Sequence, residues 1–162
     1  MTDSSEWQAI GNQRVRVEGD TVFSRWSGSP SMAEIQGYHA VLERVLAEAG
    51  KVYCLIDMRN SERPSPEARQ WMTGWARRFQ VTALAGFGAN FAMRTVATLM
   101  SRAVRFFKSD MPVMEFFETE AEARVYLAAE RARIAAKKGS AGPRSARRPP
   151  RSNPDPQKGS TG

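Results

Sequence analysis

The chain has 162 residues, of which 41% are hydrophobic and 25% are charged. This length suits one domain with an apolar core of its own and is short for two. The formal net charge is +7, but nine basic residues and one acidic residue lie in the range 131–162. Residues 1–130 are therefore close to neutral, and a fold with basic charge spread over its whole surface, as in many nucleic-acid-binding proteins, is excluded.

The cysteine content and the hydropathy pattern bear on the compartment. The single cysteine, Cys54, lies inside an apolar run, so an intramolecular disulfide is excluded and a buried, reduced thiol is expected. No segment reaches the roughly 18 uninterrupted apolar residues of a membrane span, and residues 1–20 lack the pattern of a signal peptide. These features predict a cytoplasmic protein that is not an integral membrane protein.

The first predicted elements are a hairpin and a helix. Residues 14–18 and 22–26 are rich in β-forming side chains, and Gly19 begins a turn between them. Residues 31–49 place apolar side chains at steps of three and four, and the pattern stops at Gly50. This periodicity predicts an amphipathic helix after the hairpin.

A short apolar run then predicts an interior strand. Residues 52–56 are apolar without alternation, which is typical of a parallel strand covered on both faces, and we expect the strand to end at Asp57. Residues 60–66 are predicted to form a loop in which Ser65 caps the next helix and Pro66 takes its first position.

The remaining elements alternate between strand and helix. Residues 82–88 predict a short strand, residues 90–108 a helix with one polar face, and residues 113–117 a last strand. Thr119 precedes a final helix over residues 120–138 and has the spacing of a capping box.

The predicted fold class is α/β, with the order β-β-α-β-α-β-α-β-α and a mixed, mostly parallel sheet flanked by helices. Residues 10–138 form the predicted domain, after a flexible N-terminus at residues 1–9. Residues 139–162 are rich in Pro, Ser and Arg and lack apolar periodicity, so a disordered basic C-terminal tail is expected there.

Three short patterns together with this element order resemble the STAS family, and particularly its SpoIIAA-like branch, which is also compared with lipid-binding CRAL-TRIO domains. The patterns are the strand end Leu55-Ile56-Asp57, the helix start Ser65-Pro66-Glu67 with Trp71, and the segment Phe117-Glu118-Thr119-Glu120-Ala121-Glu122-Ala123-Arg124-Val125-Tyr126-Leu127. The resemblance covers roughly residues 10–132.

The resemblance implies a bacterial, non-catalytic regulatory module of the anti-sigma-factor-antagonist type that binds a protein partner, sometimes under control of phosphorylation. In the family an acceptor serine or threonine directly follows the aspartate at the end of the central strand. Here Asp57 is followed by Met58, so Ser61 and Ser65 are candidate acceptors by location alone.

The first candidate site is this partner loop at the carboxyl edge of the sheet, where open parallel sheets usually bind their ligands. Its members are Asp57, Arg59, Asn60, Ser61, Arg63 and Ser65. The structural alternative is that Ser65 only caps a helix and Asp57 only anchors the loop.

The second candidate is a basic face on the helix at residues 90–108. Its cations are Arg94, Arg102, Arg105 and Lys108, with no acidic residue between them. Such a face can meet an acidic protein, a phosphate or a lipid headgroup, and the alternative is a solvated helix face.

The third candidate is an apolar pocket at Trp71, Trp75 and Phe79, which repeat every four residues; the alternative is ordinary core packing. No catalytic set is apparent, because no nucleophile is identified beside His39, the only histidine. No metal-binding pattern and no cofactor motif are present. Anionic lipid or nucleic acid is a further candidate partner, through the charge of the basic tail.

These observations support two functions. The leading hypothesis is a regulatory, protein-binding STAS-like module that is switched by phosphorylation of the partner loop. The rival is a small domain that binds a lipid or another apolar ligand beside Trp71 and Trp75.

Overall fold

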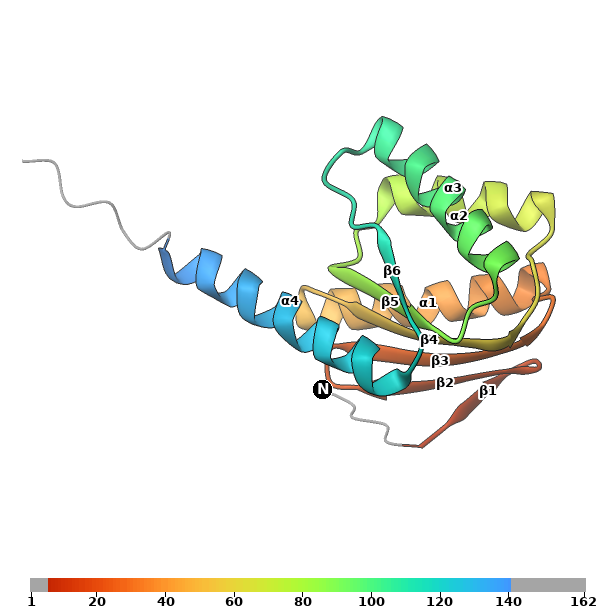
Figure 1. The fold of residues 1–162 in the computed structure, drawn as a ribbon, viewed down its shortest axis with the longest axis horizontal. Helices are drawn as coiled ribbons and strands as arrows, with labels where there is room; N and C mark the ends of the chain where they lie inside the picture. Colours follow the sequence, from red (N-terminus) through yellow and green to blue (C-terminus); the bar gives the residue numbers. More distant parts are fainter. Residues whose placement is uncertain (1–5, 141–162) are drawn as a thin grey trace, which may run out of the picture.

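The computed structural model describes residues 6–140 and contains one six-stranded sheet and four helices (Figure 1). The strands are β1 (Gln8–Ile10), β2 (Gln13–Glu18), β3 (Thr21–Gly28), β4 (Tyr53–Ser61), β5 (Ala83–Phe87) and β6 (Met114–Phe117). The helices are α1 (Met32–Ala49), α2 (Pro66–Arg78), α3 (Phe91–Phe107) and α4 (Glu120–Ser140). The α/β class and the order of the predicted elements are confirmed, and β1 is an additional strand ahead of the predicted hairpin.

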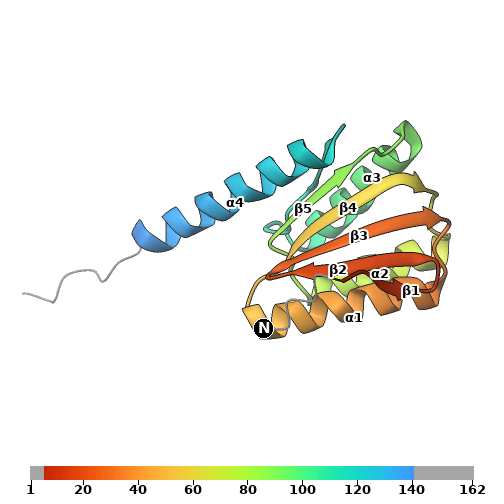
Figure 2. The same cartoon turned by 90° about the horizontal axis from the view of Figure 1, so that it is seen from below.

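The strand order explains where the helices lie. The sheet runs β1-β2-β3-β4-β5-β6; β1 to β3 pair antiparallel, and β3 to β6 pair parallel. Each crossover from β3 onward steps in the same direction, so the right-handed rule places α1, α2 and α3 on one face of the sheet. Helix α4 follows the last strand and packs on the opposite face (Figure 2).

Strand β4 is covered on both faces, as its unbroken apolar run predicts. Cys54 and Ile56 belong to the apolar layer with α1, α2 and α3. Tyr53 and Leu55 belong to the second layer, which includes Leu127 of α4. Burying a leucine side chain as completely as Leu55 contributes about 1.5–3 kcal/mol.

Side-chain caps fix the helix boundaries. The Ser31 side chain accepts a hydrogen bond from the Glu34 amide, and the Glu34 carboxylate accepts one from the Ser31 amide. Gly50 ends α1 with a φ of 70°, where a side chain would be strained. The predicted cap at Ser65 and the reciprocal cap between Thr119 and Glu122 are both present.

The predicted end of the central strand is wrong. Strand β4 continues past Asp57 to Ser61, which pairs with Gly28 beyond an irregularity between Arg25 and Ser27 of β3. The Gln13 side chain accepts a hydrogen bond from the Ser27 amide at 2.8 Å and donates one to its carbonyl at 3.2 Å. Local sequence does not reveal this pairing, because the stabilising groups come from other strands.

Both predicted ends of the domain also shift. Residues 8 and 9, which were assigned to a flexible N-terminus, belong to β1, and the Trp7 ring lies 4.9 Å from that of Phe23. Gly139 and Ser140, which were assigned to the tail, end α4. The rest of the predicted disordered tail, residues 141–162, lies outside the described residues.

Candidate functional site

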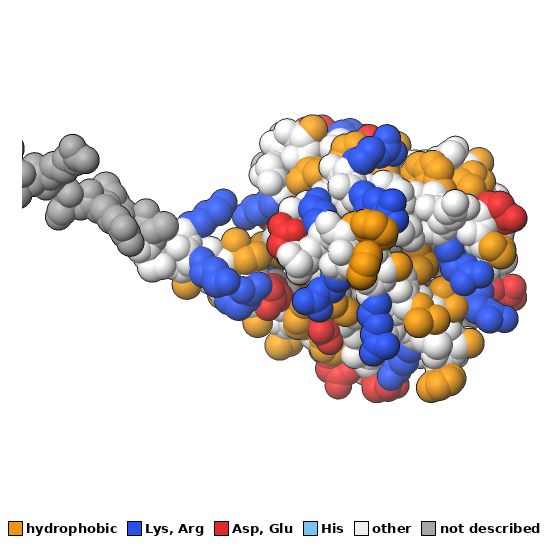
Figure 3. Space-filling view, turned by 90° about the horizontal axis from the view of Figure 1, so that it is seen from above, with side chains coloured by type: hydrophobic (Ala, Val, Ile, Leu, Met, Phe, Trp, Pro, Cys, Tyr) orange, Lys and Arg blue, Asp and Glu red, His pale blue; other side chains and the backbone are white. Residues whose placement is uncertain are grey.

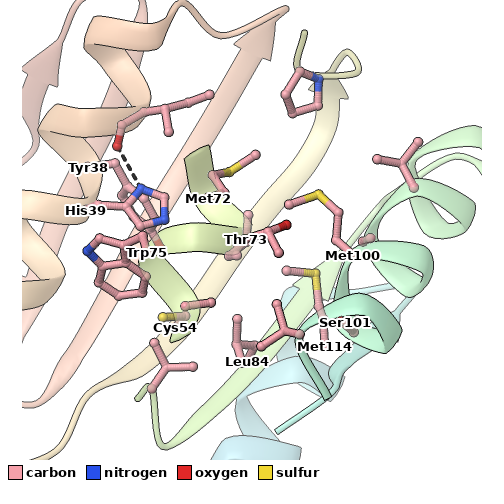
Figure 4. A pocket seen from close by; sticks show the side chains of 18 of the residues that line it. Tyr38, His39, Cys54, Met72, Thr73, Trp75, Leu84, Met100, Ser101 and Met114 are labelled. Carbon is pink, nitrogen blue, oxygen red and sulfur yellow. Dashed lines mark hydrogen bonds between the residues drawn. The ribbon is translucent and has the colours of Figure 1, made fainter. Parts of the chain in front are cut away.

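A cavity of about 200 Å³ lies between the sheet and the three helices on its face. Its wall combines residues from α1, α2, α3 and the strands β4, β5 and β6 (Figure 4). An apolar cavity of about 150 Å³ is already large enough to admit benzene in another protein. The space therefore suits a small apolar molecule or part of an acyl chain.

Methionine side chains dominate the wall. Six of the eight methionines of the chain line the cavity, namely Met58, Met72, Met93, Met100, Met111 and Met114. Figure 4 shows Met72 on α2 and Met100 on α3 reaching toward the same space, with Met114 of β6 nearby. Thioether side chains are flexible and polarisable, so this wall can adapt to ligands of different shape.

Aromatic residues of α2 form the wall beside α1. Trp75 lines the cavity, and its indole nitrogen donates a hydrogen bond to the Glu43 carboxylate at 2.7 Å. The Phe79 ring stacks on Trp75 at 5.0 Å between centroids, and the Trp71 ring meets His39 at 5.1 Å. Of the three predicted pocket residues, Trp75 thus lies in the cavity wall, while Trp71 and Phe79 pack against wall residues.

The titratable groups at the cavity are held in their uncharged forms at neutral pH. Burial lowers the pKa of His39 to about 4, and its Nδ1 donates a hydrogen bond to the Ile35 carbonyl at 2.7 Å. Burial raises the pKa of the Cys54 thiol to about 12, and raises the pKa of Tyr38 well above its ordinary value. The cavity therefore offers no charge to an anionic or cationic ligand group.

One polar atom of the wall has no hydrogen-bond partner. The Tyr38 hydroxyl is buried without one, although Ser24 and Cys54 are near enough to influence its pKa. The wall is thus mainly apolar, with a few hydroxyl side chains that include Ser61, Thr73 and Ser101.

The predicted partner loop does not form one surface. Asp57 is buried on the α4 side of the sheet, where its carboxylate accepts hydrogen bonds from Arg59 at 2.6 and 3.0 Å. Arg25 adds an ion pair to Asp57 at 3.7 Å. Burial alone would raise the pKa of Asp57, but the hydrogen bonds and charge of Arg59 lower it below its usual value.

The other members of the loop differ in accessibility. Ser61 is buried, with 8% of its surface exposed, and lines the cavity. Asn60, Arg63 and Ser65 are exposed at the carboxyl edge, and the Ser65 hydroxyl accepts a hydrogen bond from the Ala68 amide. Of the two candidate acceptors, Ser65 is therefore exposed in the folded state and Ser61 is buried.

The predicted basic face is split by its contacts. Arg94 forms an ion pair with Glu118 at 2.7 Å and donates a hydrogen bond to the Ala89 carbonyl. Arg102 and Arg105 are exposed, and Lys108 is the C-cap residue of α3. Within residues 6–140, no cluster of three or more His, Cys, Asp and Glu residues is arranged to hold a metal ion.

The apolar periodicity of α3 does not distinguish a cavity wall from ordinary core packing. In α3 the residues Met93, Val96 and Val104 repeat on one face and are buried, which is also what an ordinary core helix shows. Whether such a face meets another helix closely or leaves a space depends on how far α3 stands from α2 and the sheet. The sequence does not contain that distance.

Comparison with known proteins supports the fold. The chain is similar to an uncharacterized protein of the DUF3478 family from Shewanella loihica PV-4, described as having a SpoIIAA-like fold. The TM-score is 0.52 at 18% sequence identity, over 74% of this chain and 92% of that one. The chain therefore has a SpoIIAA-like fold, as the resemblance to the STAS family implied.

No protein-family model matches this sequence. No curated protein matches it either. No helix within residues 6–140 is both long and apolar enough to cross a membrane.

Proposed function

We propose that this protein is a non-catalytic binding module that takes a small apolar ligand into the cavity between the sheet and α1, α2 and α3. The cavity itself is the observation that carries the proposal, because a partly open, mainly apolar space with a few polar groups is typical of small-molecule sites. A ligand bound there would remove apolar wall surface from water and stabilise the folded state.

The groups at the cavity support binding rather than catalysis. The imidazole of His39 is neutral at pH 7 and has a very low pKa for a general base. The Cys54 thiol stays protonated, so it is a poor nucleophile. A ligand in this cavity meets thioether, aromatic and aliphatic side chains and a few neutral hydroxyl groups.

Titration with the neutral fluorescent probe 1-N-phenylnaphthylamine tests this function. Ala97 lines the cavity, so Ala97→Phe fills part of the space; Ala132 is exposed on α4, so Ala132→Phe is the matched control. We expect saturable binding by the wild type and the control, with energy transfer from Trp75, and at least about tenfold weaker binding by Ala97→Phe. Equal affinity in all three proteins, or uptake without saturation, would contradict the proposal.

Native mass spectrometry of the purified protein gives a second readout. A ligand carried through purification appears as a mass increment in the wild type and is absent from Ala97→Phe. Circular dichroism of each variant shows whether the substitution leaves the fold intact.

A second candidate function is regulated binding of a protein partner, and the position of Ser65 favours it. This exposed hydroxyl lies at the N-terminus of α2, and the Nε of Arg69, one turn later, is buried without a hydrogen-bond partner. A phosphate on Ser65 would gain from the helix dipole and from Arg63 and Arg69. The partner would be a protein whose binding changes when Ser65 is phosphorylated, as the family resemblance implies.

A pull-down with purified Ser65→Asp, Ser65→Ala and wild-type protein tests this candidate. The expected result is a saturable partner whose recovery differs between Ser65→Asp and Ser65→Ala. Equal recovery by all three proteins would remove the switch from consideration. Ser61→Asp is the contrasting variant, because a carboxylate at that buried position is expected to destabilise the fold.

A further inference from the structure

Helix α3 exposes large apolar side chains on the side that faces away from the cavity. Phe91 and Phe106 are each 85% exposed, and Leu99 is 58% exposed. Four of the five large hydrophobic residues that are exposed within residues 6–140 belong to this helix. Single exposed apolar residues are normal on protein surfaces, but this concentration on one helix is not.

The exposed phenylalanines share a stripe with cationic residues. Phe91, Arg102 and Phe106 are separated by 11 and 4 residues, which keeps them on one face of an α-helix. Arg105 lies beside this stripe and is exposed. Within the described residues, Arg102 and Arg105 take part in no ion pair, so their charges are available to a partner.

The charge around α3 is of one sign. The range 66–108, which contains α2, β5 and α3, has seven basic residues and one acidic residue, Glu67. The domain as a whole is near neutral, so this region is a local basic pole and not part of a general excess. Figure 3 looks onto the side of the molecule where α2 and α3 lie in Figure 1, and hydrophobic and basic side chains are interleaved there.

We propose that the outer face of α3, defined by Phe91, Leu99, Arg102, Arg105 and Phe106, docks on an anionic lipid membrane surface. A helix that places aromatic side chains among Arg residues, with no acid in its length, matches a layer of negative headgroups above apolar chains. The headgroups would neutralise Arg102 and Arg105 while the phenyl rings enter the boundary between headgroups and chains.

Helix α3 separates this surface from the cavity, and docking at the surface does not require a ligand in the cavity. The inner face of α3 contributes Met93, Met100 and Val104 to the cavity wall, so a membrane bound on the outer face would lie one helix away from the cavity. An apolar ligand could then pass from the membrane to the cavity by movement of α3. Docking itself needs only the exposed side chains, and it is measured without any cavity ligand.

The test uses a fluorescent reporter at defined positions of the full chain. Cys54 is buried, so NBD, an environment-sensitive dye, can be attached to an introduced cysteine with little reaction at Cys54. Thr95→Cys places the dye on the exposed side of α3, and Val125→Cys places it on an exposed position of α4 as the control. Vesicles of phosphatidylcholine alone are compared with vesicles that contain about 30% phosphatidylglycerol.

The expected result is a severalfold rise in NBD emission at position 95 with anionic vesicles, and no rise at position 125 or with phosphatidylcholine alone. Removing both charges in Arg102→Gln/Arg105→Gln should weaken partitioning by about 25-fold, since each cation near an anionic surface contributes about fivefold. Phe91→Ser/Phe106→Ser should abolish the rise. Arg44→Gln removes one exposed charge from α1 and should leave the partitioning unchanged.

Three outcomes would overturn the proposal. One is no rise at position 95 on anionic vesicles; another is an equal rise at both positions, which would indicate adsorption through other basic segments. The third is a change in NBD emission at position 95 when a purified protein is added, while vesicles leave the emission unchanged; this would assign the face to a protein partner. Circular dichroism and unfolding by urea verify that each variant is folded.

Discussion

Acidification should destabilise this protein through His39, the single histidine of the chain. Burial lowers the pKa of its imidazole from 6.5 to about 4 in the folded state, and unfolding restores the ordinary value. Between these two pKa values the unfolded chain binds a proton that the folded protein does not. The free energy of unfolding therefore falls as the pH falls through the window from 6.5 to 4.

The magnitude follows from the size of the shift. One pKa unit corresponds to about 1.4 kcal/mol, so the full effect is about 3 kcal/mol once the pH is below 4. Between pH 7 and pH 5 the loss should be about 2 kcal/mol. That is a substantial part of the stability of an ordinary domain, which is about 5–15 kcal/mol.

Urea unfolding at pH 7 and pH 5, followed by tryptophan fluorescence, measures the effect. His39→Asn places an amide donor near the position of Nδ1 and cannot titrate, so it should lose about 2 kcal/mol less than the wild type over the same interval. Carboxylates contribute equally to both proteins and cancel. A wild-type imidazole that titrates near pH 6.5 by NMR, or equal losses in the two proteins, would refute the buried, neutral state.

Three further substitutions test other parts of the fold, each by urea unfolding. Leu55→Ala removes a fully buried side chain between the sheet and α4 and should cost about 2–5 kcal/mol, whereas Val125→Ala on the exposed side of α4 should change stability by less than about 0.5 kcal/mol. Ser31→Ala breaks the cap of α1 and should cost about 1 kcal/mol. Asp57→Asn weakens the contacts with two partly exposed arginines and should cost about 1–2 kcal/mol at pH 7. Because the pKa of Asp57 is lowered in the folded state, the difference should begin to shrink below the ordinary carboxylate pKa of about 4 and vanish only below the lowered pKa.

Positions that depend on local interactions were predicted well. The caps at Ser65 and Thr119, the stop at Gly50 and the first turn at Pro66 follow from hydrogen bonds and backbone geometry within a few residues. The interior placement of β4 follows from an apolar run that needs cover on both faces. None of these features requires knowledge of a distant residue.

Positions that depend on distant partners were not predicted. The extension of β4 to Ser61 depends on pairing with Gly28. The contrast between buried Ser61 and exposed Ser65 follows from that pairing. The sequence alone therefore does not distinguish the two serines as candidate phosphorylation sites. Trp7, placed in a flexible terminus, packs on Phe23 and lies near Arg25, which is distant in the sequence.

The sequence by itself determined the α/β order, the capped helix ends and the apolar faces, because backbone sterics, capping and hydrophobic periodicity act over a few residues. Only the tertiary structure decided that α2 and α3 leave a methionine-lined space above the sheet and that α3 directs Phe91 and Phe106 into solvent. Those outcomes are distances and directions between elements far apart in the chain, and they arise from packing all the elements together.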